Sequence, residues 1–231
     1  MARHPTARRI HRETSPDDAF VEGALQTTVW VREHQRILMT GIIAVFVLGL
    51  AFLWYRNNTR RIREAAAVEI LQVRQMAQTG NPALTIRDAE AFVERFGGAP
   101  AALEARLMLG QAYLESNQPD QAVEAVAEIA DDLRNPSGVS AAMLTAAAHE
   151  SATRFDEAER VLLRIANDAP FDYQKVAALD NAARIRVERN QPGEAVQLYD
   201  RILGILPEDS QDRPIFEMRR AEAAAAAGST S

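Results

Sequence analysis

The chain has 231 residues, with 26 basic and 32 acidic side chains, four histidines and no cysteine. Its formal charge of −6 disfavours binding to nucleic acid, because phosphate recognition uses a clustered basic surface. The lack of cysteine excludes a thiol nucleophile and thiolate metal ligands, but it leaves the compartment open, because an oxidising compartment permits disulfides without requiring them.

The first 36 residues form a polar N-terminal tail. Within it, Ser15 and Pro16 precede two aspartates, a typical helix start with a capping serine, a proline in the first turn and an acidic residue after it. We therefore predict a juxtamembrane helix running toward Arg36. The pattern does not distinguish a helix on a membrane surface from one that continues into the next segment. Residues 1–14 are predicted to be disordered.

Residues 37–55 form an uncharged run of nineteen, eleven of which are Leu, Ile, Val or Phe. A helix of this length spans roughly 28 Å at about 1.5 Å per residue, close to the hydrocarbon thickness of about 30 Å. A buried core helix would interleave polar residues on one face, whereas only Thr40 and the terminal Trp54 and Tyr55 interrupt this run. Bulky residues follow it where a signal peptidase needs small ones, so we predict a retained transmembrane helix.

The arginines that flank this run do not determine its orientation. Within twenty residues there are two before it and five after it, which on its own would keep the C-terminal part in the cytoplasm. Including the distant arginines of the tail changes the count to six against five. Long domains also cross membranes largely regardless of charge, so the charge pattern leaves the topology open.

The remaining residues, 56–231, are sufficient for one domain with a hydrophobic core, and they carry 20 basic and 27 acidic side chains. Residues 117–123 recur as residues 190–196, seventy-three positions later, and residues 155–161 provide the copy between them. A weaker copy begins at Asp88. Four units of 36 to 37 residues therefore fit between residues 62 and 207.

The unit that contains residues 101–123 has a small residue at Ala122 and a Leu-Gly pair and a tyrosine upstream, at Leu109, Gly110 and Tyr113. This pattern resembles tetratricopeptide repeats, in which paired helices stack into a superhelix. The prolines at the ends of the next two units, Pro170 and Pro207, agree with it. In those units alanine replaces the glycine, and His149 and Arg186 replace the tyrosine, so we expect an irregular superhelix.

Helical periodicity supports the same units. Residues 101–115 carry a broad apolar stripe, and turns are predicted at residues 116–119, 151–154 and 189–193. A last helix is predicted to start within residues 212–214 and to stop at Gly228, and it is expected to cap the stack. The predicted fold is all-α, with no strand pattern: a tail at 1–36, a transmembrane helix at 37–55, and a tetratricopeptide-like α-solenoid of about four helical hairpins with its capping helix at 56–231.

No constellation of residues indicates catalysis. His149 stands alone on a predicted repeat helix, and the other three histidines lie in or beside the tail, so packing explains His149 better than metal ligation. Glu115 with Asp120, and Asp131 with Asp132, are pairs of acids best explained by solvated helix faces. We therefore predict a protein that is not an enzyme and that uses no metal and no cofactor.

The positive prediction is protein binding, because the first helices of stacked hairpins form a surface that holds extended or helical peptides. On this register the predicted protein-binding residues are Leu107, Gln111, Leu114, Glu115, Met143, Ala147, Asp180, Arg184 and Val187. Leu107 and Leu114 are equally compatible with the core, so their role stays open.

The order of segments resembles one more specific family. Residues 25–30 precede an Arg-Glu-His triplet at residues 32–34, an apolar run from about Gly41 closes with Trp-Tyr-Arg at residues 54–56, and degenerate repeats follow. This arrangement is similar, over most of residues 20–205, to the ancillary subunit family of the Sec translocon.

That resemblance implies a single-pass protein of the bacterial inner membrane, with a cytoplasmic tail and periplasmic repeats. Its implied partners are the SecYEG channel, a periplasmic chaperone and newly translocated polypeptide clients, with the lipid bilayer around its anchor. A second hypothesis is a cell-envelope scaffold that coordinates cell-wall synthesis or division.

Overall fold

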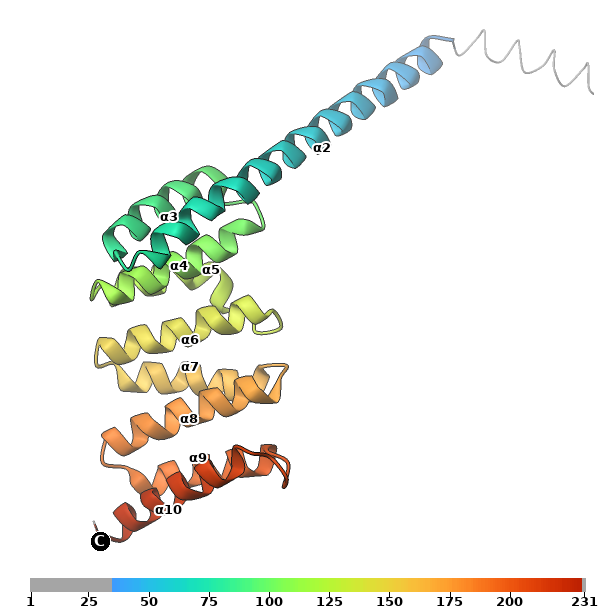
Figure 1. Ribbon diagram of the computed structural model, residues 1–231. Coiled ribbons are helices and arrows are strands. Elements are labelled where there is room, and N and C mark those ends of the chain that lie inside the picture. Colours follow the sequence, from blue (N-terminus) through green and yellow to red (C-terminus); the bar gives the residue numbers. More distant parts are fainter. Residues whose placement is uncertain (1–34, 230–231) are drawn as a thin grey trace, which may run out of the picture. The chain divides into compact units, whose positions relative to one another are not determined.

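The structure, a computed structural model, describes residues 35–229, and within this range the chain is helical without strands. The all-α prediction is therefore confirmed for the described part of the chain. The tail and the helix predicted to start at Ser15 lie outside the described residues, apart from the last two positions of the tail. Figure 1 shows the helices, which are α2 (Gln35–Gln78), α3 (Pro82–Phe96), α4 (Ala101–Glu115), α5 (Pro119–Ala130), α6 (Pro136–Ser151), α7 (Phe155–Asp168), α8 (Asp172–Glu188), α9 (Pro192–Ile205) and α10 (Arg213–Ser229).

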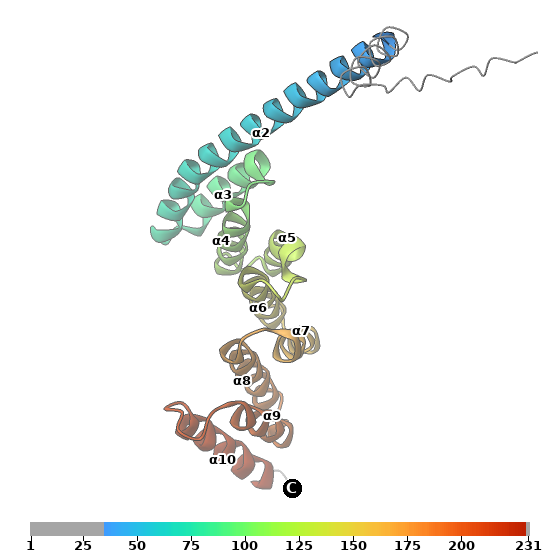
Figure 2. The same cartoon turned by 90° about the vertical axis from the view of Figure 1, so that its right-hand side faces the viewer.

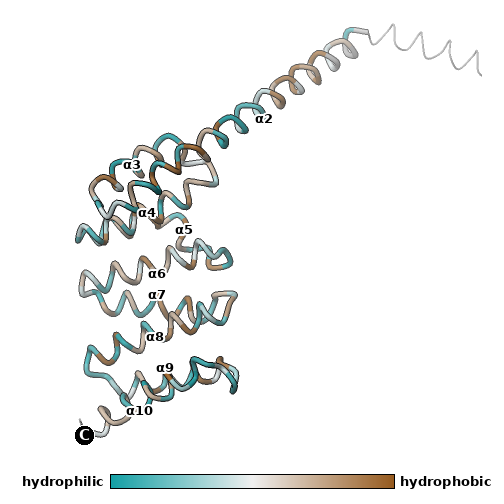
Figure 3. Tube along the Cα trace, in the orientation of Figure 1, coloured by the Kyte–Doolittle hydropathy of each residue, from teal (hydrophilic) through white to brown (hydrophobic). Residues whose placement is uncertain are grey.

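The N-terminal part of α2 exposes large apolar side chains at successive positions, and Figure 3 shows the apolar stretch. Phe46, Leu48 and Trp54 are 65, 68 and 70% exposed. Within residues 35–229, one helix, Met39–Gln78, is long and apolar enough to cross a membrane, and its most apolar window has mean hydropathy 1.8 and no buried side chain. A core helix of a soluble domain would be mostly buried, so this exposure argues against that alternative.

The hydroxyl group of Thr40, a polar side chain in this stretch, has a hydrogen-bond partner within the helix. The hydroxyl of Thr40 donates a 2.8 Å hydrogen bond to the carbonyl oxygen of Arg36, one turn earlier in the same helix. An internal bond of this kind removes most of the cost of placing a hydroxyl in an apolar environment. The single threonine therefore does not interrupt the apolar character of the helix.

The C-terminal part of α2 forms the first hairpin with α3. Its buried residues Ala66, Ile70 and Val73 recur at helical spacing and join a cluster that includes Phe92 and Phe96 of α3. The aromatic rings of Phe92 and Phe96 lie 5.1 Å apart between centroids. Three more hairpins follow, α4–α5, α6–α7 and α8–α9, and α10 packs against α9 at the end of the stack (Figure 2).

The turn inside each hairpin has the same backbone conformation. Gly80, Asn117, Thr153 and Asn190 have positive φ angles of 70, 57, 57 and 57°, and they are spaced 36 to 37 residues apart. In the three later turns the next amide reaches back to a carbonyl five residues earlier, as in the 2.8 Å bond from Arg154 N to His149 O. This closure satisfies carbonyls at the helix end and is the Schellman motif. The repeat seen in the sequence is thus present in the backbone.

Thr153 is the β-branched residue among these positions, and a threonine adopts positive φ at a steric cost that glycine does not have. Because its side chain is exposed, we expect Thr153→Gly to raise the free energy of unfolding by about 0.5 to 1 kcal/mol. Urea unfolding followed by circular dichroism measures the change. Thr153→Ala is the control, since it keeps a β-carbon at positive φ. Equal stability of the two variants would contradict the argument.

Similar ion pairs join successive units at their turns. Asp120 of α5 lies 2.7 Å from the guanidinium of Arg154, and Asp156 of α7 lies 2.7 Å from that of Arg189, one unit further along. Both aspartates are largely exposed, so each pair contributes at most about 1 kcal/mol. Their repetition links each turn to the first residues of the preceding second helix and fixes the register of the stack.

Two glycines allow helices to approach closely. A β-carbon on Gly110 of α4 would overlap the side chain of Leu144 on α6 and lie 2.9 Å from Val126 of α5. A β-carbon on Gly138 would overlap the backbone carbonyl of Asp132 and lie 2.9 Å from the carbonyl oxygen of Ile129. Gly110 is the glycine expected from the repeat pattern, whereas the sequence pattern gave no reason to single out Gly138.

The buried side chains of the repeat domain separate into two clusters that meet on α5. One cluster extends from Ala66 to Ala125 and the other from Val126 to Ala223. Adjacent residues of α5 thus point into different clusters. Packing continues between the two clusters, because the partly buried Leu107 of α4 lies against the second one.

Candidate protein-binding surface

Helix α8 presents the three predicted binding residues on one side. Asp180, Arg184 and Val187 are spaced by four and three residues, so they follow one another along the same helix face. The opposite face is buried, with Leu179 and Ile185 fully enclosed in the C-terminal core cluster. This division of α8 into a core face and an open face positions the candidate site.

These three residues line a cavity of about 370 Å³. The remaining walls come from α9 and α10, and consist of Tyr199, Arg219, Glu222, Ala223 and Ala226. Both α8 and α10 pack against α9, and the cavity lies between the two outer helices. The structure therefore brings the α8 residues together with side chains of the last helix, which the sequence had indicated only as a cap.

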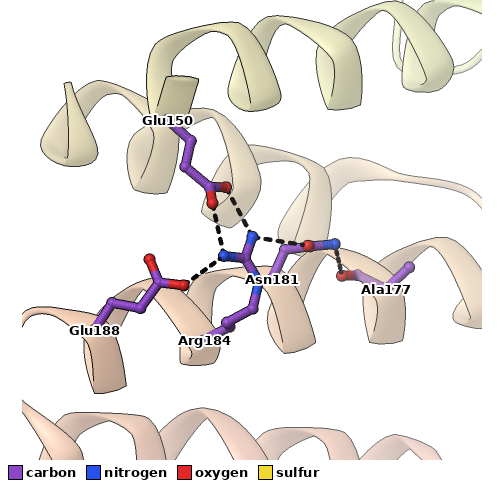
Figure 4. Close-up of polar contacts among 5 residues, drawn as sticks. All are labelled: Glu150, Ala177, Asn181, Arg184 and Glu188. Carbon is purple, nitrogen blue, oxygen red and sulfur yellow. Dashed lines mark hydrogen bonds and ion pairs between the residues drawn. The ribbon is translucent and has the colours of Figure 1, made fainter. Parts of the chain in front are cut away.

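Arg184 is the centre of a polar network that joins two hairpins (Figure 4). Its guanidinium donates to both carboxylate oxygens of Glu150 on α6, at 2.6 and 2.7 Å, and to Glu188 at 2.9 Å. Asn181 lies beside it and donates to the carbonyl oxygen of Ala177. The hydrogen bond to Glu150 raises the pKa of Arg184 above its already high value, so the side chain carries its charge at every physiological pH.

A second ion pair crosses from α8 to α10. Both carboxylate oxygens of Asp180 accept hydrogen bonds from Arg219, and this contact raises the pKa of Arg219. The guanidinium of Arg219 also lies 5.6 Å from the ring centroid of Phe216. Tyr199 also lines the cavity, and burial and then the charge of Asp180 raise its pKa and keep its hydroxyl protonated. The cavity is thus lined by charged groups and by an aromatic ring.

The six other predicted binding residues do not line this cavity. Leu107 and Met143 are partly buried and pack against the C-terminal core cluster, so at these two positions the structure shows a packing role. Leu114 is half-buried. Gln111, Glu115 and Ala147 are exposed, and Gln111 donates a 3.1 Å hydrogen bond to Glu115. Binding by the open residues of α4 and α6 stays a prediction.

The tyrosine position of the repeat has a different polar environment in each unit. Tyr113 donates to the carboxylate of Glu90, and burial together with that bond raises its pKa to about 12. Arg186 donates at 2.6 Å to Glu159, whose side chain is only 7% exposed. His149 occupies the same position in the unit between them, and within the described residues its buried Nδ1 has no hydrogen-bond partner.

Burial lowers the pKa of His149, with Arg154 acting in the same direction and Glu157 and Asp120 opposing it; Arg160 also lowers it. The unfolded chain therefore takes up this proton more readily than the folded chain. Its contribution to stability is complete above the unfolded pKa of about 6.5 and is lost as the pH falls through the lower folded value.

We expect His149→Gln to reduce the fall in unfolding midpoint between about pH 8 and about pH 5. Thermal unfolding followed by circular dichroism at each pH measures this fall. The comparison within each protein removes any pH-independent cost of the substitution. An unchanged pH dependence in the variant would show that other titrating groups cause the fall in unfolding midpoint at low pH.

No cluster of three or more His, Asp or Glu side chains suitable for a metal ion occurs within residues 35–229. The charged groups of the candidate site are instead paired with one another across helices.

Antiparallel helix pairs that repeat every 36 to 37 residues define an α-solenoid, a class of helical repeat protein. The model of the tetratricopeptide repeat-like domain family matches residues 29–219, and the chain belongs to this family. Its repeats constitute a protein–protein interaction module, and the fold is typical of scaffolds without catalytic activity.

Solved structures show the same fold. A crystal structure of "Podosopora anserina putative kinesin light chain nearly identical TPR-like repeats" aligns with a TM-score of 0.57 and 22% identity, over 72% of this chain and 89% of the other. A single-substitution variant of that protein aligns with a TM-score of 0.56 and 22% identity, over 72% and 88% of the two chains. At this identity the likeness concerns the fold alone. The comparison with curated proteins gave no match.

Proposed function

We propose that this protein is a membrane-anchored binding module that assists newly translocated polypeptides beside the Sec translocon. The observation that carries the proposal is the pairing of two features in one chain: a helix with an unburied apolar surface and an interaction module of tetratricopeptide-like repeats. The first feature favours lipid as its surroundings, because its side chains have no protein partner to cover them. The second favours polypeptides as ligands.

Anchoring is the first part to test. Alkaline carbonate removes peripheral proteins from membranes and leaves spanning proteins in place, so the full chain should remain in the pellet. An arginine at Leu48 opposes insertion by about 2.5 to 3.5 kcal/mol and should shift the chain to the soluble fraction. A matched serine variant at Leu48 should stay in the membrane. Complete release of the unaltered chain by carbonate would refute the anchor.

The proposed topology places the tail in the cytoplasm and the repeats in the periplasm. It rests on the resemblance to the ancillary translocon subunits, since the arginine count leaves orientation open. Protease added to spheroplasts should digest the repeat domain, whereas the same domain in inverted inner-membrane vesicles should be protected. The opposite pattern of protection would show that the repeats lie in the cytoplasm and would contradict the proposed topology.

The translocon partner is tested by photo-crosslinking in living cells. A photoreactive amino acid at Phe46 or Leu50, which are exposed in the apolar helix, should capture a subunit of the SecYEG channel. The same probe at Glu94, exposed on α3, serves as the control for contacts outside the membrane. Absence of channel adducts from both helix positions would contradict the translocon partner, and accumulation at the division septum would favour the envelope scaffold instead.

A further inference from the structure

A second cavity of about 480 Å³ lies between the N-terminal halves of α8 and α10. It shares Asp180 and Arg219 with the cavity described above, so that ion pair separates the two. Its apolar walls are Tyr173, Val176, Ile205, Leu206, Ile215 and Phe216. The volume is within the range of sites that enclose large apolar groups. Sequence reasoning missed this site because its walls come from two stretches, residues 172–180 and 205–219, that only the packing of the helices brings together.

The mouth of this cavity exposes apolar surface that the fold itself does not use. Tyr173 is 68% and Ile215 46% exposed, although both line the cavity. Phe171, 48% exposed, stacks on Tyr173 with 5.8 Å between ring centroids. Exposed aromatic and aliphatic side chains gathered around a hollow are typical of surfaces that bind a partner's apolar side chain.

In addition to the shared aspartate, two acidic residues line the same cavity, and two more lie in the chain between its lining residues Pro207 and Asp212. Asp172 and Asp212 line the cavity, and Glu208 and Asp209 follow Pro207 in the connection between α9 and α10. Within the described residues, the carboxylates of Glu208, Asp209 and Asp212 take part in no ion pair.

The basic groups near this opening do not balance these charges. Three of these basic groups are each matched by one acid: Arg219 by Asp180, Lys175 by Asp172 at 3.6 Å, and Arg213 by Glu217. Within residues 35–229 they leave the charges of Glu208, Asp209 and Asp212 unmatched. The apolar cavity thus has a rim of net negative charge.

We infer that this cavity binds polypeptide segments in which a bulky apolar side chain is flanked by lysine or arginine. The apolar side chain enters the cavity and contacts Tyr173 and Ile215, while the basic neighbours lie against the acidic rim. Charge complementarity selects such a segment over one with acidic flanks. The inference rests on the proposed function in that the occupant is a polypeptide, and it adds the position of the site and the chemistry of its ligand.

The test measures peptide binding to the full chain in neutral detergent micelles by fluorescence anisotropy. Two labelled decapeptides share a central Leu-Phe pair, flanked by lysines in one and by glutamates in the other. The lysine peptide should bind at least about tenfold more tightly, and this preference should shrink as NaCl rises from about 50 to about 300 mM. Equal binding of the two peptides, or no saturable binding of either, would overturn the inference.

Two variants locate the binding. Ile215→Ser removes apolar contact at the mouth, and Asp212→Asn removes one rim charge; each should weaken the lysine peptide about three- to tenfold. Because both side chains are exposed, helical content should stay unchanged in circular dichroism. Leu71→Ser and Glu94→Gln are matched controls at exposed positions of α2 and α3. Weakening by the controls to the same extent would refute binding at this cavity.

The two proposals fail separately. Loss of charge preference with retained channel crosslinks would overturn the peptide chemistry and leave the translocon partner supported. Retained charge preference with no crosslinks would overturn the translocon partner and support a polypeptide-binding module that acts elsewhere.

Discussion

Gly138→Ala is expected to lower the free energy of unfolding by about 3 kcal/mol, the upper part of the range for overpacked cores. The added β-carbon would overlap the carbonyl of Asp132 and crowd that of Ile129. These are backbone atoms at the end of α5 and in the connection to α6, and they cannot rotate away as a side chain can. The first turn of α6 would therefore have to move away from α5.

Gly193→Ala provides a matched control, because Gly193 also lies in a first helical turn that begins with proline, and its β-carbon would meet no atom within 4 Å. There alanine should raise stability by about 0.5 to 1 kcal/mol. Urea unfolding followed by circular dichroism measures both variants. Similar stability of the two would show that the stack accommodates the clash without cost.

Glu159→Leu is expected to cost about 3 kcal/mol, because it leaves the half-buried guanidinium of Arg186 without its enclosed partner. Arg186 retains Gln191 at 2.6 Å and Glu194 at 2.8 Å, which places the loss at the lower end for broken buried pairs. The double variant Glu159→Leu, Arg186→Met should recover most of this loss, since it removes the unpaired charge as well.

The exposed ion pair of Arg60 and Glu64, with side chains 78 and 62% exposed, is the control for this double-mutant cycle at Glu159 and Arg186. Glu64→Leu should change stability by no more than about 0.5 kcal/mol. The coupling is read from unfolding midpoints of the two single variants and the double variant. Additive effects at Glu159 and Arg186 would mean that the pair does not act as a unit.

Local signals in the sequence were sufficient for much of the fold. Residues 101–115 were predicted as a helix from their apolar stripe, and α4 has these bounds. The turns were predicted from their Asn, Ser, Gly and Pro residues, and the hairpins turn there. The last helix was predicted to start within residues 212–214 and begins at Arg213; it extends to Ser229, one residue past Gly228. These features depend on neighbours in the chain, which a sequence displays directly.

The candidate site was predicted less completely, because it depends on contacts between distant residues. Asp180, Arg184 and Val187 could be placed on the open face of α8 from periodicity alone. Their partner Arg219 lies 39 residues after Asp180, and only the packing of α10 on α9 shows that the two meet. The closeness of Gly138 to the end of α5 is equally invisible in the sequence, because a glycine in a helix has no periodic signature.

The meeting of the two buried clusters on α5 affects how the repeat domain unfolds locally. Because Ala125 and Val126 belong to different clusters, local unfolding that begins at one end of the solenoid disrupts the packing of the nearer cluster first. The cluster at the other end can keep its contacts, because each repeat packs only against its neighbours. Loss of packing in the terminal repeats therefore need not unfold the whole domain.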